Sequence, residues 1–170
     1  TGRGAIEAGL AGCSIEDSSG RPEEPMRPLE AAAERIAAAV EAADGRIVLT
    51  ARAENHLHGR HDLADTIRRL QAFQEAGADV LYAPGLRDLD DIRRVVAETD
   101  RPVNVLARPG LPAVAELAGA GVARVSVGGG FAFAALGAVV EAATELREQG
   151  TYGFWRQGAL GWRAAKEAFS

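Results

Sequence analysis

Polar side chains stand at several points where short apolar segments of the chain end. They are an acidic pair, an arginine followed by a glutamate and an asparagine, a lone asparagine, and a serine before a glycine run: Glu16 and Asp17, Arg52 with Glu54 and Asn55, Asn104, and Ser126 with residues 128–130. A carboxylate suits a hard cation such as Mg²⁺, a guanidinium can bind a carboxylate through two parallel hydrogen bonds, and a carboxamide adds a neutral hydrogen-bonding group. Together they could bind a small carboxylate beside Mg²⁺. Each group alone also has a structural explanation as a cap or a surface ion pair.

Three histidines crowd one loop, and three glycines stand in a row further along the chain. His56, His58 and His61 have a spacing that could hold a metal, but Gly59 and Arg60 lie between them, and we favour a solvated or lid-like loop. The glycines at 128–130 could cradle an anion at a helix start, although they lack the spacing of a nucleotide-binding fingerprint.

The elements that must position these groups form a repeated pattern of helix, glycine stop and strand. An Ala-Gly step ends a predicted helix at residues 8–9, 76–77 and 120–121, because glycine readily takes the left-handed conformation that turns a chain sharply out of a helix. The pattern predicts five strands, each followed by a helix: 12–16, 46–51, 79–83, 102–106 and 123–127. Connections of this kind imply an α/β fold with a parallel sheet covered by helices.

Two architectures fit five such units. One is a doubly wound, flavodoxin-like sheet, which would make the chain a non-catalytic module that binds an anion near residues 128–130. The other is the last five units of an eight-stranded barrel, which as a whole needs about 250 residues. We favour the barrel because the chain begins in mid-helix and because the polar groups collect at the carboxyl ends of several strands. On this interpretation residues 1–150 are barrel units and 151–170 are a helical tail.

The charge and hydropathy of the chain indicate which classes of partner it is not expected to bind. Its 170 residues carry 19 Lys and Arg against 24 Asp and Glu, a net charge of −5, with no basic block, so nucleic acid is not an expected partner. The chain lacks both an apolar run of about 20 residues and a signal-like start, so we expect no membrane association and a cytoplasmic protein.

The succession of motifs resembles the isocitrate lyase and phosphoenolpyruvate mutase superfamily, in its mutase-like branch. The likeness covers about residues 5–150, and the matching stretches keep their order along the chain: 12–17 (Gly-Cys-Ser-Ile-Glu-Asp), 49–55 (Leu-Thr-Ala-Arg-Ala-Glu-Asn), 76–86, 102–107 and 121–128.

This resemblance implies a (β/α)₈ TIM barrel of which strands 4 to 8 are present here. It implies a Mg²⁺-dependent enzyme, lyase-like or phosphonomutase-like, that makes or breaks a C–C or P–C bond in a small 2-oxo or 2-hydroxy acid through an enolate-like species. Glu16 would then belong to the Mg²⁺ shell through water, Arg52 would grip the substrate carboxylate or stabilise the enolate as a catalytic residue, and Asn104 would line the substrate pocket. A homo-oligomer is also implied, with the last helices exchanged between subunits.

The chain departs from the family pattern in four places, one of which is the missing lysine- and asparagine-bearing loop of the phosphonate-making enzymes. The strand that carries the metal-binding aspartates lies outside this sequence, the loop at 18–28 lacks the Lys-Lys-Cys-Gly-His motif of isocitrate-type lyases, and Pro84 replaces a glutamate found in several lyases. We therefore expect neither isocitrate nor methylisocitrate lyase activity, and we expect this chain alone to be a poor catalyst.

Overall fold

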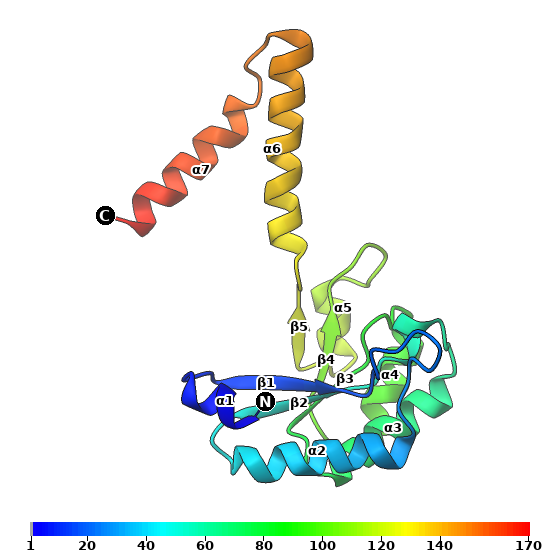
Figure 1. Cartoon of the computed structure of the whole chain (residues 1–170). Helices are drawn as coiled ribbons and strands as arrows, with labels where there is room; N and C mark the ends of the chain where they lie inside the picture. The colour runs from blue at the N-terminus through cyan, green and yellow to red at the C-terminus, as the bar shows by residue number, and fades with distance from the viewer. Residues whose placement is uncertain (1) are drawn as a thin grey trace. The chain divides into compact units, whose positions relative to one another are not determined.

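A parallel α/β sheet with helices on one face forms the larger part of the molecule (Figure 1). The structure is a computed structural model, and it describes residues 2–170. Its strands are β1 (Gly12–Glu16), β2 (Val48–Arg52), β3 (Val80–Tyr82), β4 (Val103–Leu106) and β5 (Arg124–Ser126). Its helices are α1 (Gly2–Glu7), α2 (Leu29–Ala43), the 3₁₀ helix η1 (Asn55–His58), α3 (Leu63–Glu75), α4 (Leu89–Ala97), α5 (Val114–Gly119), α6 (Gly130–Gln149) and α7 (Trp155–Ala168).

The strands follow one another across the sheet in chain order, β1-β2-β3-β4-β5, and every neighbouring pair is parallel. Sequential parallel order is the arrangement of a barrel wall, whereas a doubly wound sheet reverses its order at a switch point. The predicted barrel-type α/β fold is therefore confirmed, and the flavodoxin-like alternative is wrong.

The hydrophobic core lies between the sheet and helices α2 to α5. Strand residues such as Leu49, Leu81 and Val105 pack there with helix residues such as Phe73 and Ile92, all almost fully buried. Successive side chains of a strand point to opposite faces, so the residues that alternate with this set face away from the helices. That second face carries the polar groups of interest.

Glycine and aspartate fix the ends of the helices. Gly77 and Gly121 follow α3 and α5 with φ of 98° and 87°, and a Cβ at these positions would lie 3.0 Å from a methyl of Val40 and 2.9 Å from one of Val96. Only glycine meets both conditions without strain. Aspartate caps are also present at two helix starts: Asp62 accepts the amide of Asp65 in α3, and Asp88 accepts two amides at the start of α4.

Four strands differ by one or two residues from their predicted bounds, and β3, β4 and β5 are each shorter than the predicted 79–83, 102–106 and 123–127. β2 begins at Val48 instead of residue 46, because Ile47 packs with Ala5 and Ala43 in a small cluster of its own. The last helix, α7, spans Trp155–Ala168, within the segment 151–170 that was expected to be a helical tail.

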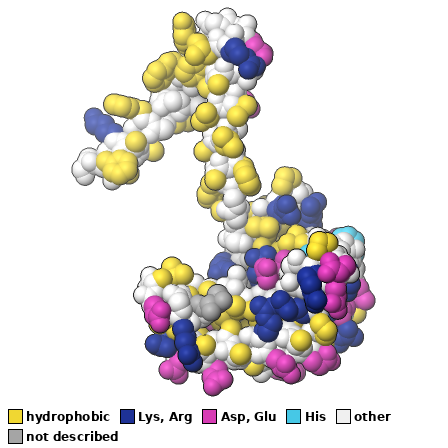
Figure 2. Space-filling model, viewed as in Figure 1, with side chains coloured by type: hydrophobic (Ala, Val, Ile, Leu, Met, Phe, Trp, Pro, Cys, Tyr) yellow, Lys and Arg dark blue, Asp and Glu magenta, His cyan; other side chains and the backbone are white. Residues whose placement is uncertain are grey.

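Contacts divide the chain into two units, the first ending at Ser126 and the second comprising Val127–Ser170. The second unit consists of α6 and α7, neither of which contains a buried residue. Figure 2 shows hydrophobic side chains over both helices. The division falls before α6 because this helix buries nothing, so the boundary at residue 150 stays a prediction. No helix in the described part of the chain is long and apolar enough to cross a membrane.

Candidate active site

One polar row crosses the sheet, from the carboxyl ends of β1, β2 and β3 to Asn104 within β4 and Arg124 at the start of β5. The register pairs Glu16 with Arg52, Arg52 with Tyr82, Tyr82 with Asn104, and Asn104 with Arg124. Laterally paired residues of a parallel sheet point to the same face. The three residues predicted to form the site thus share one row with two others, on the face opposite the helices.

Arg52 is the most constrained member of this row. Its Nε lies 2.7 Å from Oε1 of Glu54 and 3.5 Å from Oε2 of Glu16, and its guanidinium stands over the ring of Tyr82, 5.2 Å from the centroid. Burial alone would lower the pKa of Arg52. The hydrogen bond and the negative charge of Glu54 outweigh this effect, so the pKa of Arg52 lies above its ordinary value. Arg52 therefore stays cationic in a fixed orientation. Nε is the nearest nitrogen in both ion pairs, and neither Nη atom of Arg52 makes a hydrogen bond within the described residues.

Glu54 and Tyr82 are the buried partners of this arginine. Burial raises the pKa of the Glu54 carboxyl, and Arg52 acts in the opposite direction. Burial also raises the pKa of the Tyr82 hydroxyl, against a hydrogen bond with Ser126 and the charge of Arg52. Sequence reasoning missed Tyr82, since an aromatic residue in an apolar strand is typical of a core; counting two residues from Val80 would have placed it on the polar face.

Asn104 is buried with both ends of its amide engaged. Nδ2 donates to Oγ of Ser126 at 3.0 Å, and Oδ1 accepts from Nε of Arg124 at 2.9 Å. Tyr82 lies between Asn104 and Arg52 in the register, so Asn104 shares the row with Arg52 without contacting it. Arg124 is a second cation of this row that sequence reasoning did not single out.

A cavity of about 440 Å³ lies on the same face of the sheet. Its lining comes from both ends of the strand order, with Gly12 and Ser14 from β1, Thr50 from β2 and Arg124 from β5. Side chains from the first and last strands can meet around one cavity only if the sheet is curved. The polar face is therefore concave, like the inside of a barrel.

The carboxylate of Glu16 could supply only part of the coordination shell of Mg²⁺. Glu16 is half exposed, with 47% of its side chain accessible, and its one ion pair is long. Across residues 2–170, no three His, Cys, Asp or Glu side chains converge as a metal cluster. Because Mg²⁺ keeps several waters and takes only one or two carboxylates, Glu16 is suited to hold it through water.

The histidines and the glycine run that the sequence singled out lie outside the polar row. Nδ1 of His56 lies 3.4 Å from Nδ1 of His61, and His56 belongs to the 3₁₀ helix that follows β2. Burial, with the neighbouring charge of His61, lowers the pKa of His56. Gly129 and Gly130 form the start of α6, where Gly129 is the N-cap residue.

Asp17 and Asn55 belong to a buried polar network next to the row. Asp17 pairs with Arg69 of α3, and Asn55 donates to Asp65 of the same helix at 2.7 Å. Arg69 was missed by sequence reasoning, because nothing near it along the chain indicates that its partner lies 52 residues away. The spacing of Asp65 and Arg69, four residues apart on one helix, was the available signal.

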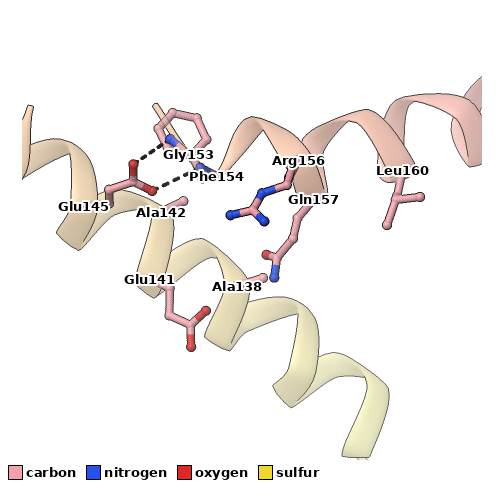
Figure 3. Close-up of a pocket in the computed structure, with 9 residues that line it drawn as sticks. All are labelled: Ala138, Glu141, Ala142, Glu145, Gly153, Phe154, Arg156, Gln157 and Leu160. Carbon is pink, nitrogen blue, oxygen red and sulfur yellow. Dashed lines mark hydrogen bonds between the residues drawn. The ribbon is translucent and has the colours of Figure 1, made fainter. Parts of the chain in front are cut away.

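Another cavity, of about 780 Å³, lies between α6 and α7 of the second unit (Figure 3). Its walls are side chains such as Ala138, Leu160 and Gln157, and none of the polar row reaches it. It is a groove of a helical hairpin, so size alone does not locate the chemistry here.

Fold and row together describe a barrel-type α/β protein with a row of polar side chains on one face of its sheet. Residues 1–147 match the family model described as phosphoenolpyruvate phosphomutase. The chain therefore belongs to the phosphoenolpyruvate phosphomutase family, which confirms the predicted superfamily.

Relatives with known structures or curated descriptions are consistent with this family assignment. A crystal structure from Burkholderia cenocepacia J2315, of a protein provisionally classed as a lyase/mutase, is 54% identical with a TM-score of 0.88 over 91% of this chain and 58% of that one. The oxaloacetate decarboxylase of Chromohalobacter salexigens is 32% identical over 83% of this chain and 51% of its own length. Phosphonopyruvate hydrolase in complex with oxalate and Mg²⁺ is 26% identical with a TM-score of 0.75, covering 99% of this chain and 66% of that one.

The homologues are thus lyases and mutases. The chain spans about half the length of the curated relatives it matches, between 44% and 51% of each.

Proposed function

We propose that this chain supplies the carboxylate-binding rim of a Mg²⁺-dependent enzyme that makes or breaks a C–C or P–C bond in a small 2-oxo or 2-hydroxy acid. The observation that carries this proposal is the row in which Glu16, Arg52, Tyr82 and Asn104 lie side by side on the concave face. Similarity to an oxaloacetate decarboxylase and to phosphonopyruvate hydrolase supports the substrate class.

Arg52 is the residue that binds the acid. Glu54 and the Tyr82 ring hold its guanidinium, so little side-chain entropy is lost when a ligand carboxylate pairs with the Nη edge. The same fixed cation would stabilise the negative charge that grows on an enolate oxygen. Asn104, held by Ser126 and Arg124, would contribute a neutral wall to the pocket.

Glu16 would hold Mg²⁺ through water at the edge of the row. The ion, when bound, supplies a positive charge that favours the enolate-like species over the neutral acid. Glu16 would keep its carboxylate free for this role, since it is half exposed and its contact with Arg52 is long.

Isothermal titration calorimetry with oxalate tests this proposal. Oxalate is a stable, planar analogue of the enolate of a small 2-oxo acid. We expect oxalate to bind the chain more tightly with Mg²⁺ than with a chelator. Arg52→Lys should weaken binding by about tenfold or more, because a charged hydrogen bond contributes ~1.5–3 kcal/mol and ~1.4 kcal/mol is a factor of ten.

Arg94→Lys is the matched control, since Arg94 is exposed and pairs with Glu98 on α4. It should leave binding unchanged. Equal oxalate affinity of the wild type and Arg52→Lys would refute the assignment of Arg52.

A further inference from the structure

A buried ion pair lies next to the candidate site, where β1 and β2 end. Nη1 of Arg69 is 3.1 Å from Oδ2 of Asp17, and the accessible fractions of the two side chains are 8% and 0%. Burying two charges is costly unless further hydrogen bonds satisfy them. Such bonds are present, and they lead to the functional arginine.

Arg69 connects three segments that are distant in the sequence. Besides Asp17, Nη1 donates to the carbonyl oxygen of Arg27 at 3.1 Å, and Nε donates to Oδ2 of Asp65 at 3.0 Å. Asp65 in turn accepts from Asn55. The hydrogen bonds to Arg69 and Asn55 hold the pKa of Asp65 below its usual range despite partial burial. A planar guanidinium can serve three acceptors in different directions, whereas an ammonium cannot keep all three.

Asp17 connects Arg69 to the end of β2 through backbone hydrogen bonds. Its Oδ1 accepts the backbone amide of Glu54 at 2.9 Å, and its own amide donates to the carbonyl of Arg52 at 3.2 Å. Asp17 thus holds the backbone on both sides of residue 53. From that backbone Glu54 reaches Nε of Arg52 at 2.7 Å.

We propose that Arg69 is a positioning residue for Arg52, acting through the contacts Arg69 to Asp17, Asp17 to the Glu54 backbone, and the Glu54 carboxylate to the Arg52 guanidinium. This inference rests on the proposed function of Arg52 as the carboxylate-binding group. Arg69 itself is buried on α3, with 8% of its side chain accessible.

A double-mutant cycle with Arg69→Lys and Arg52→Lys tests the connection. We expect Arg69→Lys to weaken oxalate binding about tenfold and to have no further effect when Arg52 is already lysine, since residues that act through one another are not additive. Arg94→Lys should change neither background. Full additivity of the two substitutions would overturn the proposal, because a general loss of stability would weaken both backgrounds alike.

A second readout needs no ligand. The Nε–Hε resonance of Arg52, assigned by its absence in Arg52→Lys, should move in Arg69→Lys and stay in place in Arg94→Lys. An unmoved resonance in Arg69→Lys would contradict the positioning role even if oxalate binds. Conversely, if the wild type fails to bind oxalate, the proposed function fails while this resonance still decides the inference.

Asp17→Asn serves as the second variant should Arg69→Lys not fold. It keeps the shape of the side chain and an oxygen for the Glu54 amide, but it loses the charge that pairs with Arg69. We expect the same shift of the Arg52 resonance and the same non-additive loss of oxalate affinity. An unshifted resonance in a folded Asp17→Asn protein would also overturn the proposal.

Discussion

Glu16 and Arg52 are neighbours in the row but have different proposed roles, Mg²⁺ binding through water for Glu16 and carboxylate binding for Arg52. Arg52 is held on three sides by Glu54, Tyr82 and, at longer range, Glu16. Glu16 has only the long contact and remains half exposed. The arginine is therefore preorganised for a carboxylate, whereas the glutamate is free to turn toward a cation and its waters.

Glu16→Gln should accordingly separate the two tasks. We expect the gain in oxalate affinity that Mg²⁺ provides to fall by about tenfold, the scale on which residues behind a metal's direct ligands act. Affinity without Mg²⁺ should be unchanged or slightly better, because a negative charge near the ligand has gone. Calorimetric titrations with and without Mg²⁺ measure both quantities.

Glu41→Gln, which neutralises an exposed carboxylate on α2, is the control for this measurement. A Glu16→Gln protein that keeps the full effect of Mg²⁺ would show that Glu16 lies outside the metal shell.

At the scale of elements, the sheet was more predictable than the contacts between its connections. β1 has the predicted bounds, and the caps Asp62 and Asp88 and the glycine stops are where local sequence signals place them. These features depend on neighbouring residues alone. The Asp17–Arg69 pair and the position of Tyr82 depend on which strands lie side by side, which no local pattern reveals.

The hairpin of α6 and α7 depends on one carboxylate. Oε1 of Glu145 accepts the hydroxyl of Thr151 and the amide of Gly153, both at 2.5 Å. Oε2 accepts the amide of Phe154 at 3.0 Å. Figure 3 shows the hydrogen bonds of Glu145 with Gly153 and Phe154. Glu145 thereby satisfies amides at the start of α7 that have no partner within the helix. These hydrogen bonds, led by that of Thr151, lower the pKa of Glu145.

Acid should therefore loosen this hairpin. A carboxyl whose pKa is lower in the folded state stabilises that state above its unfolded pKa, and the contribution is lost as the pH falls through the folded value. We expect the amide proton of Gly153 to move upfield with a midpoint below ~4.3, the ordinary pKa of glutamate. NMR spectra across pH 2 to 7 follow this shift.

Glu145→Gln should remove that titration, and Glu141→Gln should keep it, because Glu141 lines the same groove one turn earlier. A titration of Gly153 that survives in Glu145→Gln would contradict the role of Glu145.

At the scale of the whole molecule, the second unit exposes more apolar surface than a monomer commonly tolerates. Eleven large apolar side chains between residues 127 and 170 are exposed by about half or more, including Phe133 at 73%, Trp155 at 64% and Trp162 at 75%. Large exposed apolar patches of this kind mark interaction surfaces. We therefore predict that the chain forms a homo-oligomer through this unit.

Sedimentation velocity tests this prediction. We expect the wild type to sediment with a mass above the 17.8 kDa of one chain, and Phe133→Glu with Trp162→Glu to shift it toward the monomer. Val114→Glu, which adds a charge at an exposed apolar position of the first unit, should leave the mass unchanged. A wild type that stays monomeric at micromolar concentration would contradict this assignment.

The proposed function requires that a small acid binds at the Nη edge of Arg52. A crystal structure of the chain with oxalate and Mg²⁺ tests this most directly. We predict oxalate oxygens within about 3 Å of the Arg52 guanidinium, the length of a charged hydrogen bond, with the ion on the side of Glu16. Oxalate bound away from the row, with Arg52 still paired only to Glu54 and Glu16, would contradict the proposed function.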